Sequence, residues 1–433
     1  MRRMTVRGCG LVLFIAMLVA VAVAAPAALA QDGPPSKPDI VVIMVDDLGF
    51  TDNRILERLP NIKALFLDGG LSFTQYFGET PLCCPGRAEF LTGQHVRRNH
   101  VVRNDARLLD PTNTLATTLH DDGYETALVG KYFNHSDLLT DKMPPGWDHL
   151  AMYTSDTDIP STFYIDGNGP ITEGYLDRFV VDDSVNWVSG LDPDEPFFLL
   201  DTPRAPHFKA GDALTAWLPA VEDRYVDDPR CAGIAPWAPP SYAYLTQPLG
   251  WPLDDICRSM LTVDDLVGQL QEEMHTLHRD PIYVFTSDNG MAWGQHGFPV
   301  KNNPYATQMP LYFTGAGIRP AATNALESNI DLGPTLAELA GTTMPYADGQ
   351  SFARVLYDPN AAGRTWMLED EPTAQFTNGP WRKKWWGIRE PGWYLLQVGT
   401  NRPLVFNLVK DPWRLHPVRK PLIKQELKAL YPY

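Results

Sequence analysis

The stretch PDIVVIMVDD (38–47) decides the fold of this chain. Its residues 40–45 are apolar without interruption and rich in β-branched side chains, and two aspartates follow directly. An unbroken apolar run of this kind is typical of a strand buried on both faces, as strands in parallel sheets are. The stretch PIYVFTSDNG (281–290) has the same character and also ends in an acid and an amide. The two stretches therefore predict two central strands of a parallel sheet.

Shorter patterns complete the prediction of the fold. Apolar runs predict further strands at 125–129 and 196–200, and helical spacing predicts helices at 59–67, 257–274 and 331–339. This alternation predicts an α/β sandwich with a central, mostly parallel sheet flanked by helices. Aromatic-rich runs predict short antiparallel strands at 366–368, 385–388 and 393–398. We expect a main domain over residues 36–360 and a small antiparallel α+β subdomain over 361–433.

Composition narrows the class of protein. The 433 residues are 44% hydrophobic, 20% charged and 11% aromatic, which is a globular profile. The formal net charge is −16. Proteins that bind nucleic acids generally need a surplus of Lys and Arg, so no nucleic-acid partner is expected. An anionic small molecule would need a local basic pocket.

The N-terminal residues resemble an export signal. Arg2, Arg3 and Arg7 precede an apolar run over residues 11–25, and Ala28-Leu29-Ala30 provides small residues for cleavage. This order is typical of a secretory signal peptide over residues 1–30, cleaved near Ala30, and predicts a secreted or extracytoplasmic protein. The alternative is a membrane anchor, but the run is short for a span of about 20 residues. We therefore expect no membrane span in the mature chain.

Polar residues gather where the predicted strands end. They are Asp46-Asp47, Lys131, His207 and Asp288-Asn289. Ligands of open α/β sheets bind beyond the carboxyl ends of the strands. One acidic pair alone would be read as a solvated turn, but two such clusters after the two most apolar strands favour a metal site. Carboxylate and amide oxygens are hard ligands, suited to Ca²⁺ or Mg²⁺ rather than zinc.

The segment CCPGRAEFLTG (83–93) carries the most specific motif. It contains C-x-P-x-R and continues as A-x-x-L-T-G, and it resembles the signature of the sulfatase family. The resemblance extends along almost the whole mature chain, including VDDLG (45–49), TSDNG (286–290) and FNLVKDP (406–412). The doubled cysteine and GKYFN (130–134) are most similar to the N-acetylglucosamine-6-sulfatase and heparan endosulfatase branch.

The resemblance implies an alkaline-phosphatase-like sandwich and a specific set of site residues. Asp46, Asp47, Asp288 and Asn289 would bind one Ca²⁺, in preference to Mg²⁺ or Mn²⁺. A maturation enzyme would oxidise Cys83 to formylglycine (3-oxoalanine), whose hydrated diol would also meet the metal. Arg87 would orient that diol. The residues implied to contact the sulfate and the leaving oxygen are Lys131, His207 and Lys301, with His296 as a further contact.

The resemblance also implies a reaction. The diol would displace the alcohol from sulfur, a general acid (His207 or Lys301) would protonate the departing oxygen, and the second hydroxyl would let the sulfate leave. We therefore expect an exported sulfatase that hydrolyses sulfate monoesters, with sulfated sugars as the substrates that the branch implies. Two alternatives are a phosphonate or phosphate ester hydrolase of the same superfamily and a non-catalytic protein that binds sulfated glycans.

Several residues depart from the family pattern or have two interpretations. Phe133 stands where many sulfatases have His, and the loop 305–310 is shorter and lacks two acids and an arginine. If Cys83 is modified, Cys231 and Cys257 flank a long loop and form the expected disulfide, while Cys84 stays a buried thiol. A Cys83–Cys84 bridge would be strained and would remove the nucleophile. Four arginines are assigned to a solvated face rather than to a substrate site: Arg97, Arg98, Arg103 and Arg107.

Overall fold

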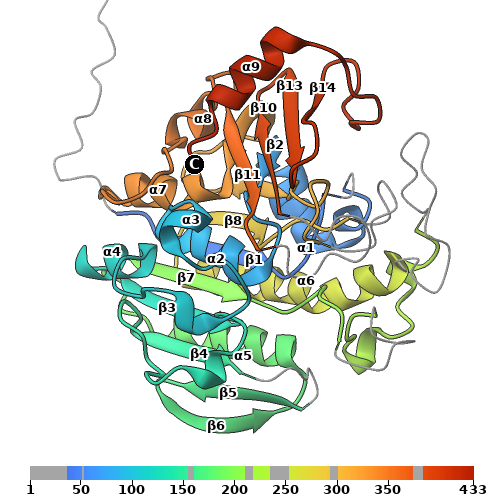
Figure 1. The fold of residues 1–433 in the computed structure, drawn as a ribbon. Helices are drawn as coiled ribbons and strands as arrows, with labels where there is room; N and C mark the ends of the chain where they lie inside the picture. The colour runs from blue at the N-terminus through green and yellow to red at the C-terminus, as the bar shows by residue number, and fades with distance from the viewer. Residues whose placement is uncertain are drawn as a thin grey trace, which may run out of the picture. The chain divides into compact units, whose positions relative to one another are not determined.

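The computed structural model describes residues 37–50, 53–154, 160–209, 218–234, 253–292, 301–373 and 384–433. Residues Lys37–Tyr433 form one compact unit, shown in Figure 1. The predicted signal peptide (1–30) and His296 lie outside the described residues.

A ten-stranded sheet in the order β10-β2-β9-β8-β1-β7-β3-β4-β5-β6 organises this unit. The neighbouring strands β8, β1, β7, β3 and β4 are parallel, whereas β9 and the β5–β6 edge run antiparallel to their neighbours. All four strands predicted in the main domain are present, as β1, β3, β7 and β8. The bounds are β1 Ile40–Val45, β2 Leu71–Phe77, β3 Glu125–Gly130, β4 His149–Tyr153, β5 Ser161–Ile165, β6 Asn168–Glu173, β7 Phe197–Thr202, β8 Ile282–Ser287, β9 Leu311–Thr314 and β10 Ala321–Ser328.

Helices cover both faces of this sheet. The predicted helices 257–274 and 331–339 are confirmed as α6 and α7, and the predicted helix 59–67 is a short α-helix, α1, that continues as a π-helix over Lys63–Asp68. The bounds are α1 Pro60–Ile62, α2 Cys83–Thr92, α3 Val96–Asn99, α4 Leu115–Asp121, α5 Leu176–Ser189, α6 Leu253–Thr276, α7 Asn329–Leu339 and α8 Ala353–Tyr357. Short 3₁₀ turns lie at Leu56–Arg58, Ala106–Leu108, Ser136–Leu138, Asp223–Tyr225 and Pro229–Cys231.

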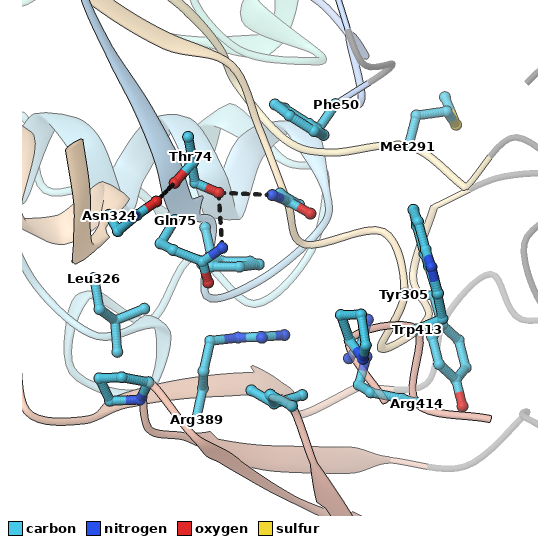
Figure 2. A pocket seen from close by; sticks show the side chains of 15 residues that line it. Phe50, Thr74, Gln75, Met291, Tyr305, Asn324, Leu326, Arg389, Trp413 and Arg414 are labelled. Carbon is cyan, nitrogen blue, oxygen red and sulfur yellow. Dashed lines mark hydrogen bonds between the residues drawn. The ribbon is translucent and has the colours of Figure 1, made fainter. Parts of the chain in front are cut away.

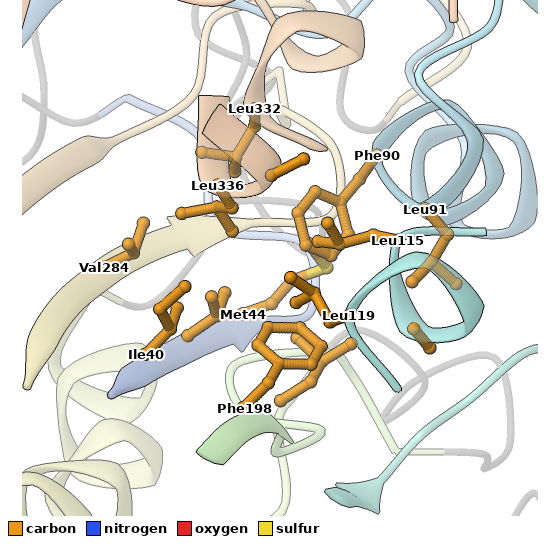
Figure 3. Close-up of a cluster of buried hydrophobic side chains, with 14 of the residues drawn as sticks. Ile40, Met44, Phe90, Leu91, Leu115, Leu119, Phe198, Val284, Leu332 and Leu336 are labelled. Carbon is orange, nitrogen blue, oxygen red and sulfur yellow. The ribbon is translucent and has the colours of Figure 1, made fainter. Parts of the chain in front are cut away.

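Strand β1 contributes to two hydrophobic clusters because its side chains alternate between the faces of the sheet. Ile40, Val42 and Met44 belong to one cluster, and Val41, Ile43 and Val45 belong to the other. Figure 3 shows the first cluster, where residues of α2, α4 and α7 pack on β1 and β8. Every residue of β1 is buried, which confirms a strand covered on both sides.

A second sheet forms the C-terminal part of the unit. Strands β11 Met367–Glu371, β12 Trp385–Arg389, β13 Trp393–Val398 and β14 Leu404–Asn407 are all antiparallel, and α9 Pro421–Ala429 packs on one face. Trp386 stacks on Tyr431, with ring centroids 4.0 Å apart. Met367 joins this sheet to the main one through Phe77 and Leu326. The predicted antiparallel subdomain is thus confirmed in its architecture, and its boundary near residue 360 stays a prediction.

The cysteines are paired as predicted. Cys231 and Cys257 form a disulfide with their Cα atoms 5.5 Å apart, whereas Cys83 and Cys84 are free and buried. A search of the described helices finds none long and apolar enough to cross a membrane.

Asp201, in β7, provides a test of the packing between β7 and α5. Ser184 Oγ donates to one oxygen of Asp201, and the other oxygen is buried without a hydrogen-bond partner. Burial raises the pKa of Asp201 to about 8 from 3.8. The unfolded chain therefore loses this proton at a lower pH than the folded chain, so the contribution of Asp201 to stability falls as the pH rises through this range.

We predict that the free energy of unfolding of Asp201→Asn, minus that of the unsubstituted chain, increases as the pH rises. The increase should be on the order of 3 kcal/mol between about pH 5 and pH 8. Urea titrations at both pH values would measure this difference. Asp182→Asn, at an exposed position of α5, is the matched control and should show no such trend. A constant difference between Asp201→Asn and the unsubstituted chain would contradict the prediction.

Candidate active site

The two acidic clusters lie side by side because β1 and β8 are neighbouring parallel strands. Their register pairs Val45 with Ser287, so both clusters emerge at the same edge of the sheet. The Asp47 amide donates to Asp288 Oδ1 at 3.1 Å, and Asn289 Nδ2 donates to Asp47 Oδ1 at 2.8 Å. These bonds join residues that are 241 and 242 positions apart in the chain.

Helix α2 brings Cys83 and Arg87 to these acids. Cys83 is the first residue of α2, so the positive end of the helix faces the cluster. Its Sγ lies 3.5 Å from Asp46 Oδ1 and 4.0 Å from Asp47 Oδ1. Arg87 lies one turn later on the same face, and its Nε donates to Asp288 Oδ2 at 2.9 Å.

Three further nitrogen-bearing side chains surround the acids. Lys131 follows β3 and pairs with Asp46, while Lys301 pairs with Asp47 and lies 2.8 Å from Cys83 Sγ. His207 Nε2 lies 3.5 Å from Asp47 Oδ2. The other ring nitrogen of His207, Nδ1, is 2.6 Å from the Phe208 carbonyl oxygen and donates to it. The structure therefore brings together every described residue that the sequence predicted for the site.

These charges shift the ionisation of one another. Burial disfavours the Asp46 carboxylate, but Lys131, His207 and Arg87 hold its pKa well below its usual range. Burial and the charge of Asp46 raise the pKa of Asp288 to about 6. Burial lowers the pKa of His207 to about 4, although Asp46 and Asp47 oppose that shift. Burial and Asp46 also raise the pKa of the Cys83 thiol, which disfavours the thiolate.

The donor set fits a divalent cation. Asp46, Asp47, Cys83 and His207 each offer an atom within 4.8 Å of the others. In addition, Asp47 Oδ2 and Asn289 Oδ1 are buried without a hydrogen-bond partner. An unpaired buried oxygen is costly, and coordination to a hard cation would offset that cost. These atoms therefore form a candidate site for a divalent cation.

One cavity borders the site, and a second lies near the ends of its acidic segments. One, of about 360 Å³, is lined by Lys131 and His207 together with Asn134, Tyr153 and Arg204. The other, of about 530 Å³, lies between the two sheets, as Figure 2 shows. One side of this cavity is lined by Phe50 and Met291, which follow the two acidic clusters in the sequence. The opposite side is lined by Arg389 and Arg414 of the C-terminal part.

Sequence reasoning did not select Arg204 or Asn134. Arg204 is buried, lies three residues before His207 and lines the same cavity. Asn134 lies in the GKYFN motif, and its backbone amide donates to Cys84 Sγ at 3.2 Å. The sequence pattern around Arg204 is weak, because many solvated residues also follow a strand. Phe133, which departs from the family pattern, is buried and lines the cavity as well.

Comparisons with known proteins agree with this geometry. The family model described as Sulfatase matches residues 38–342. N-acetylglucosamine-6-sulfatase of Capra hircus is 26% identical over 377 residues, covering 77% of this chain and 66% of that protein. Choline-sulfatase of Rhizobium meliloti is 27% identical over 435 residues, covering 88% of this chain and 82% of that protein. The chain thus spans about two thirds of the length of the animal enzyme.

A solved structure has the same fold. It is a protein in complex with its substrate D-glucosamine-2-N,6-O-disulfate, with a TM-score of 0.72 and 19% sequence identity, and the match covers 91% of this chain and 96% of that one.

The close approach of α2 to the acids can be tested at Gly86. A methyl group on Gly86 would lie 2.0 Å from the backbone oxygen of Asp288, so the helix would have to move away. We predict that Gly86→Ala lowers the free energy of unfolding by about 1–3 kcal/mol, measured by urea titration. Gly174→Ala, where a methyl group meets nothing within 4 Å, is the matched control. Equal stability of the two variants would show that the approach is not as tight as described.

Proposed function

The chain belongs to the sulfatase family, and on that premise we propose that it hydrolyses sulfate monoesters of sulfated sugars outside the cytoplasm. One observation carries the proposal: Cys83, Arg87, Lys131, His207 and Lys301 converge on one cluster of acids. The similarity to an N-acetylglucosamine-6-sulfatase supports sugar sulfates as the substrate class.

The proposal includes two groups that complete the site. Asp46, Asp47, Asp288, Asn289 and residue 83 would hold a Ca²⁺ ion, preferred to Mg²⁺ or Mn²⁺. When bound, this ion would supply positive charge that offsets the charge on the sulfate oxygens in the transition state. A maturation enzyme would convert Cys83 to formylglycine, which would supply the nucleophilic oxygen.

The remaining residues would bind and orient the sulfate. Lys131 and Lys301 bring positive charge to the acids, and the N-terminus of α2 adds its partial positive charge. Arg87 is buried and held by Asp288, so it can fix the orientation of residue 83, four positions earlier. These contacts would hold the ester so that the reacting groups are aligned.

Two side chains are our candidates for the group that donates a proton to the departing alcohol. His207 lines the cavity, and its Nε2 faces the acids because Nδ1 donates to the Phe208 carbonyl. Lys301 Nζ lies 2.8 Å from Cys83 Sγ, beside the atom that would carry the nucleophile. We assign the general acid to one of these two residues. His296 would be a further contact of the sulfate.

Export is part of the proposal. The charged and apolar N-terminal pattern ending near Ala30 supports a signal peptide. The Cys231–Cys257 disulfide also supports an oxidising compartment, because such bonds persist mainly outside the cytosol. We further propose that residues 36–360 form the catalytic domain and residues 361–433 a subdomain beside it.

The activity is tested with the chain produced together with a formylglycine-generating enzyme. We predict turnover of 4-nitrophenyl sulfate, and faster turnover of N-acetylglucosamine-6-sulfate than of choline sulfate. Cys83→Ala should lower the rate by about 10³-fold or more, because the nucleophile is lost. Cys84→Ser is the matched control and should keep most of the activity.

The rival functions give different results in the same assay. A higher rate on phosphate diesters or phosphonates than on sulfate esters would indicate a phosphorus ester hydrolase. Full activity of Cys83→Ala would refute the assigned nucleophile. Binding of sulfated sugars without any turnover by the matured chain would indicate a non-catalytic binding protein.

A further inference from the structure

The C-terminal residues have a charge opposite to that of the whole chain. The protein has 36 Lys and Arg against 52 Asp and Glu. Residues 401–433, in contrast, contain seven Lys and Arg and only two acids, Asp411 and Glu426. An acidic protein repels polyanions over most of its surface, so a local basic region is where a polyanion could approach.

These basic residues surround a groove of about 780 Å³ beside the C-terminal sheet. The turn before β14 forms one wall, and the segment 417–421 with the following helix α9 forms the other. Figure 1 shows α9 and β14, which contribute residues to this groove, in the red C-terminal part of the chain. None of the described residues that line the groove is acidic. Its basic residues are Arg402, Arg419, Lys420, Lys424 and Lys428.

The positive charges of the groove are not used inside the protein. Four of the five side chains belong to exposed residues, and Lys424 is half-buried. Within the described part of the chain, no ion pair joins any of them to an acid. Glu426, the one acid of α9, acts instead on Glu390, whose pKa burial and Glu426 raise. The charges of the groove are therefore available to a ligand.

The basic residues between 97 and 107 provide the contrast. Arg97 pairs with Asp370, Arg98 with Asp348, and both Arg103 and Arg107 with Asp105. Each of those arginines thus has a carboxylate partner, although Arg103 and Arg107 share one. The basic residues of the C-terminal groove therefore differ from those between 97 and 107, because they have no acidic partner among the described residues.

We propose that this groove binds a sulfated polysaccharide chain and holds polymeric substrate on the enzyme. The inference rests on the proposed function, in which sulfate esters of sugars are the substrate. Guanidinium and ammonium groups pair with oxyanions, and several of them along a groove match the repeated charges of a sulfated polymer. A lipid surface fits less well, because Leu427 and Ile423 of α9 pack against the C-terminal sheet.

The groove is joined to the catalytic site by packing. The same C-terminal sheet carries Trp385, whose indole nitrogen donates to the Asn302 carbonyl at 3.4 Å, next to Lys301. A polymer held by the groove would therefore be anchored to the body that contains the site. Small sulfate esters would not need this contact.

The experiment compares polymeric and small substrates in the triple variant Arg419→Gln/Lys420→Gln/Lys424→Gln. Heparin binding is measured in the Cys83→Ala background so that the probe is not consumed. We expect the Kd for heparin to rise about tenfold or more, and the affinity of the unsubstituted groove to fall with added salt. In the matured active enzyme, KM for heparin should rise similarly, whereas kcat/KM for 4-nitrophenyl sulfate stays within about twofold.

A control variant separates the effect of the groove from a general loss of positive charge. Arg58→Gln/Arg319→Gln removes two exposed positive charges outside the groove and should leave heparin binding nearly unchanged. Unchanged heparin affinity in the triple variant would overturn the proposal. The proposal would also be overturned if the protein bound phosphatidylglycerol vesicles more tightly than heparin and the triple variant lost that binding. Such a result would assign the groove to membranes. A matured chain could bind heparin through the groove and yet hydrolyse no sulfate ester. That result would refute the proposed function but support the groove as a binding site.

Discussion

The structure depends on the burial of three carboxylates at one edge of one sheet. Asp46, Asp47 and Asp288 are almost fully buried. Charges buried in this way destabilise a protein unless cations and hydrogen bonds compensate them. Lys131, Lys301 and Arg87 supply that compensation within the chain, and the unpaired oxygens of Asp47 and Asn289 leave room for a further cation. The residues that compensate this buried charge come from segments far apart in the sequence.

The fold brings those segments together with few irregularities. Parallel pairing of β1 with β8 and β7 places three strand ends at one edge, and α2 approaches this edge closely because Gly86 has no side chain. The C-terminal sheet supports the Lys301 segment through Trp385. In this arrangement the reactive position, residue 83, lies at the start of a helix and against the acids, and a cavity lined by Lys131 and His207 borders the same site.

The sequence predicted the elements whose burial is uniform and missed those that depend on their neighbours. β1 and β8 are continuous apolar runs, so their position could be recognised directly. β6 (NGPITE) and β10 (AATNALES) have no comparable pattern and are ordered by pairing with adjacent strands. Helix α2 was not predicted because all ten of its residues are buried, which removes the amphipathic period that identifies a helix. The site residues at the ends of strands could be predicted from their position in the expected sheet. Cys83, Arg87 and Lys301 could be predicted only from the family resemblance.

The central claim is that acids from two distant segments hold a divalent cation beside residue 83. Its most direct test is the calcium content of the purified chain after dialysis against calcium, measured by inductively coupled plasma mass spectrometry. The account predicts about one Ca²⁺ per chain, and almost none in Asp47→Asn/Asn289→Ala, whose folding is checked by circular dichroism. A chain without bound divalent metal, or a folded double variant that keeps the ion, would contradict it.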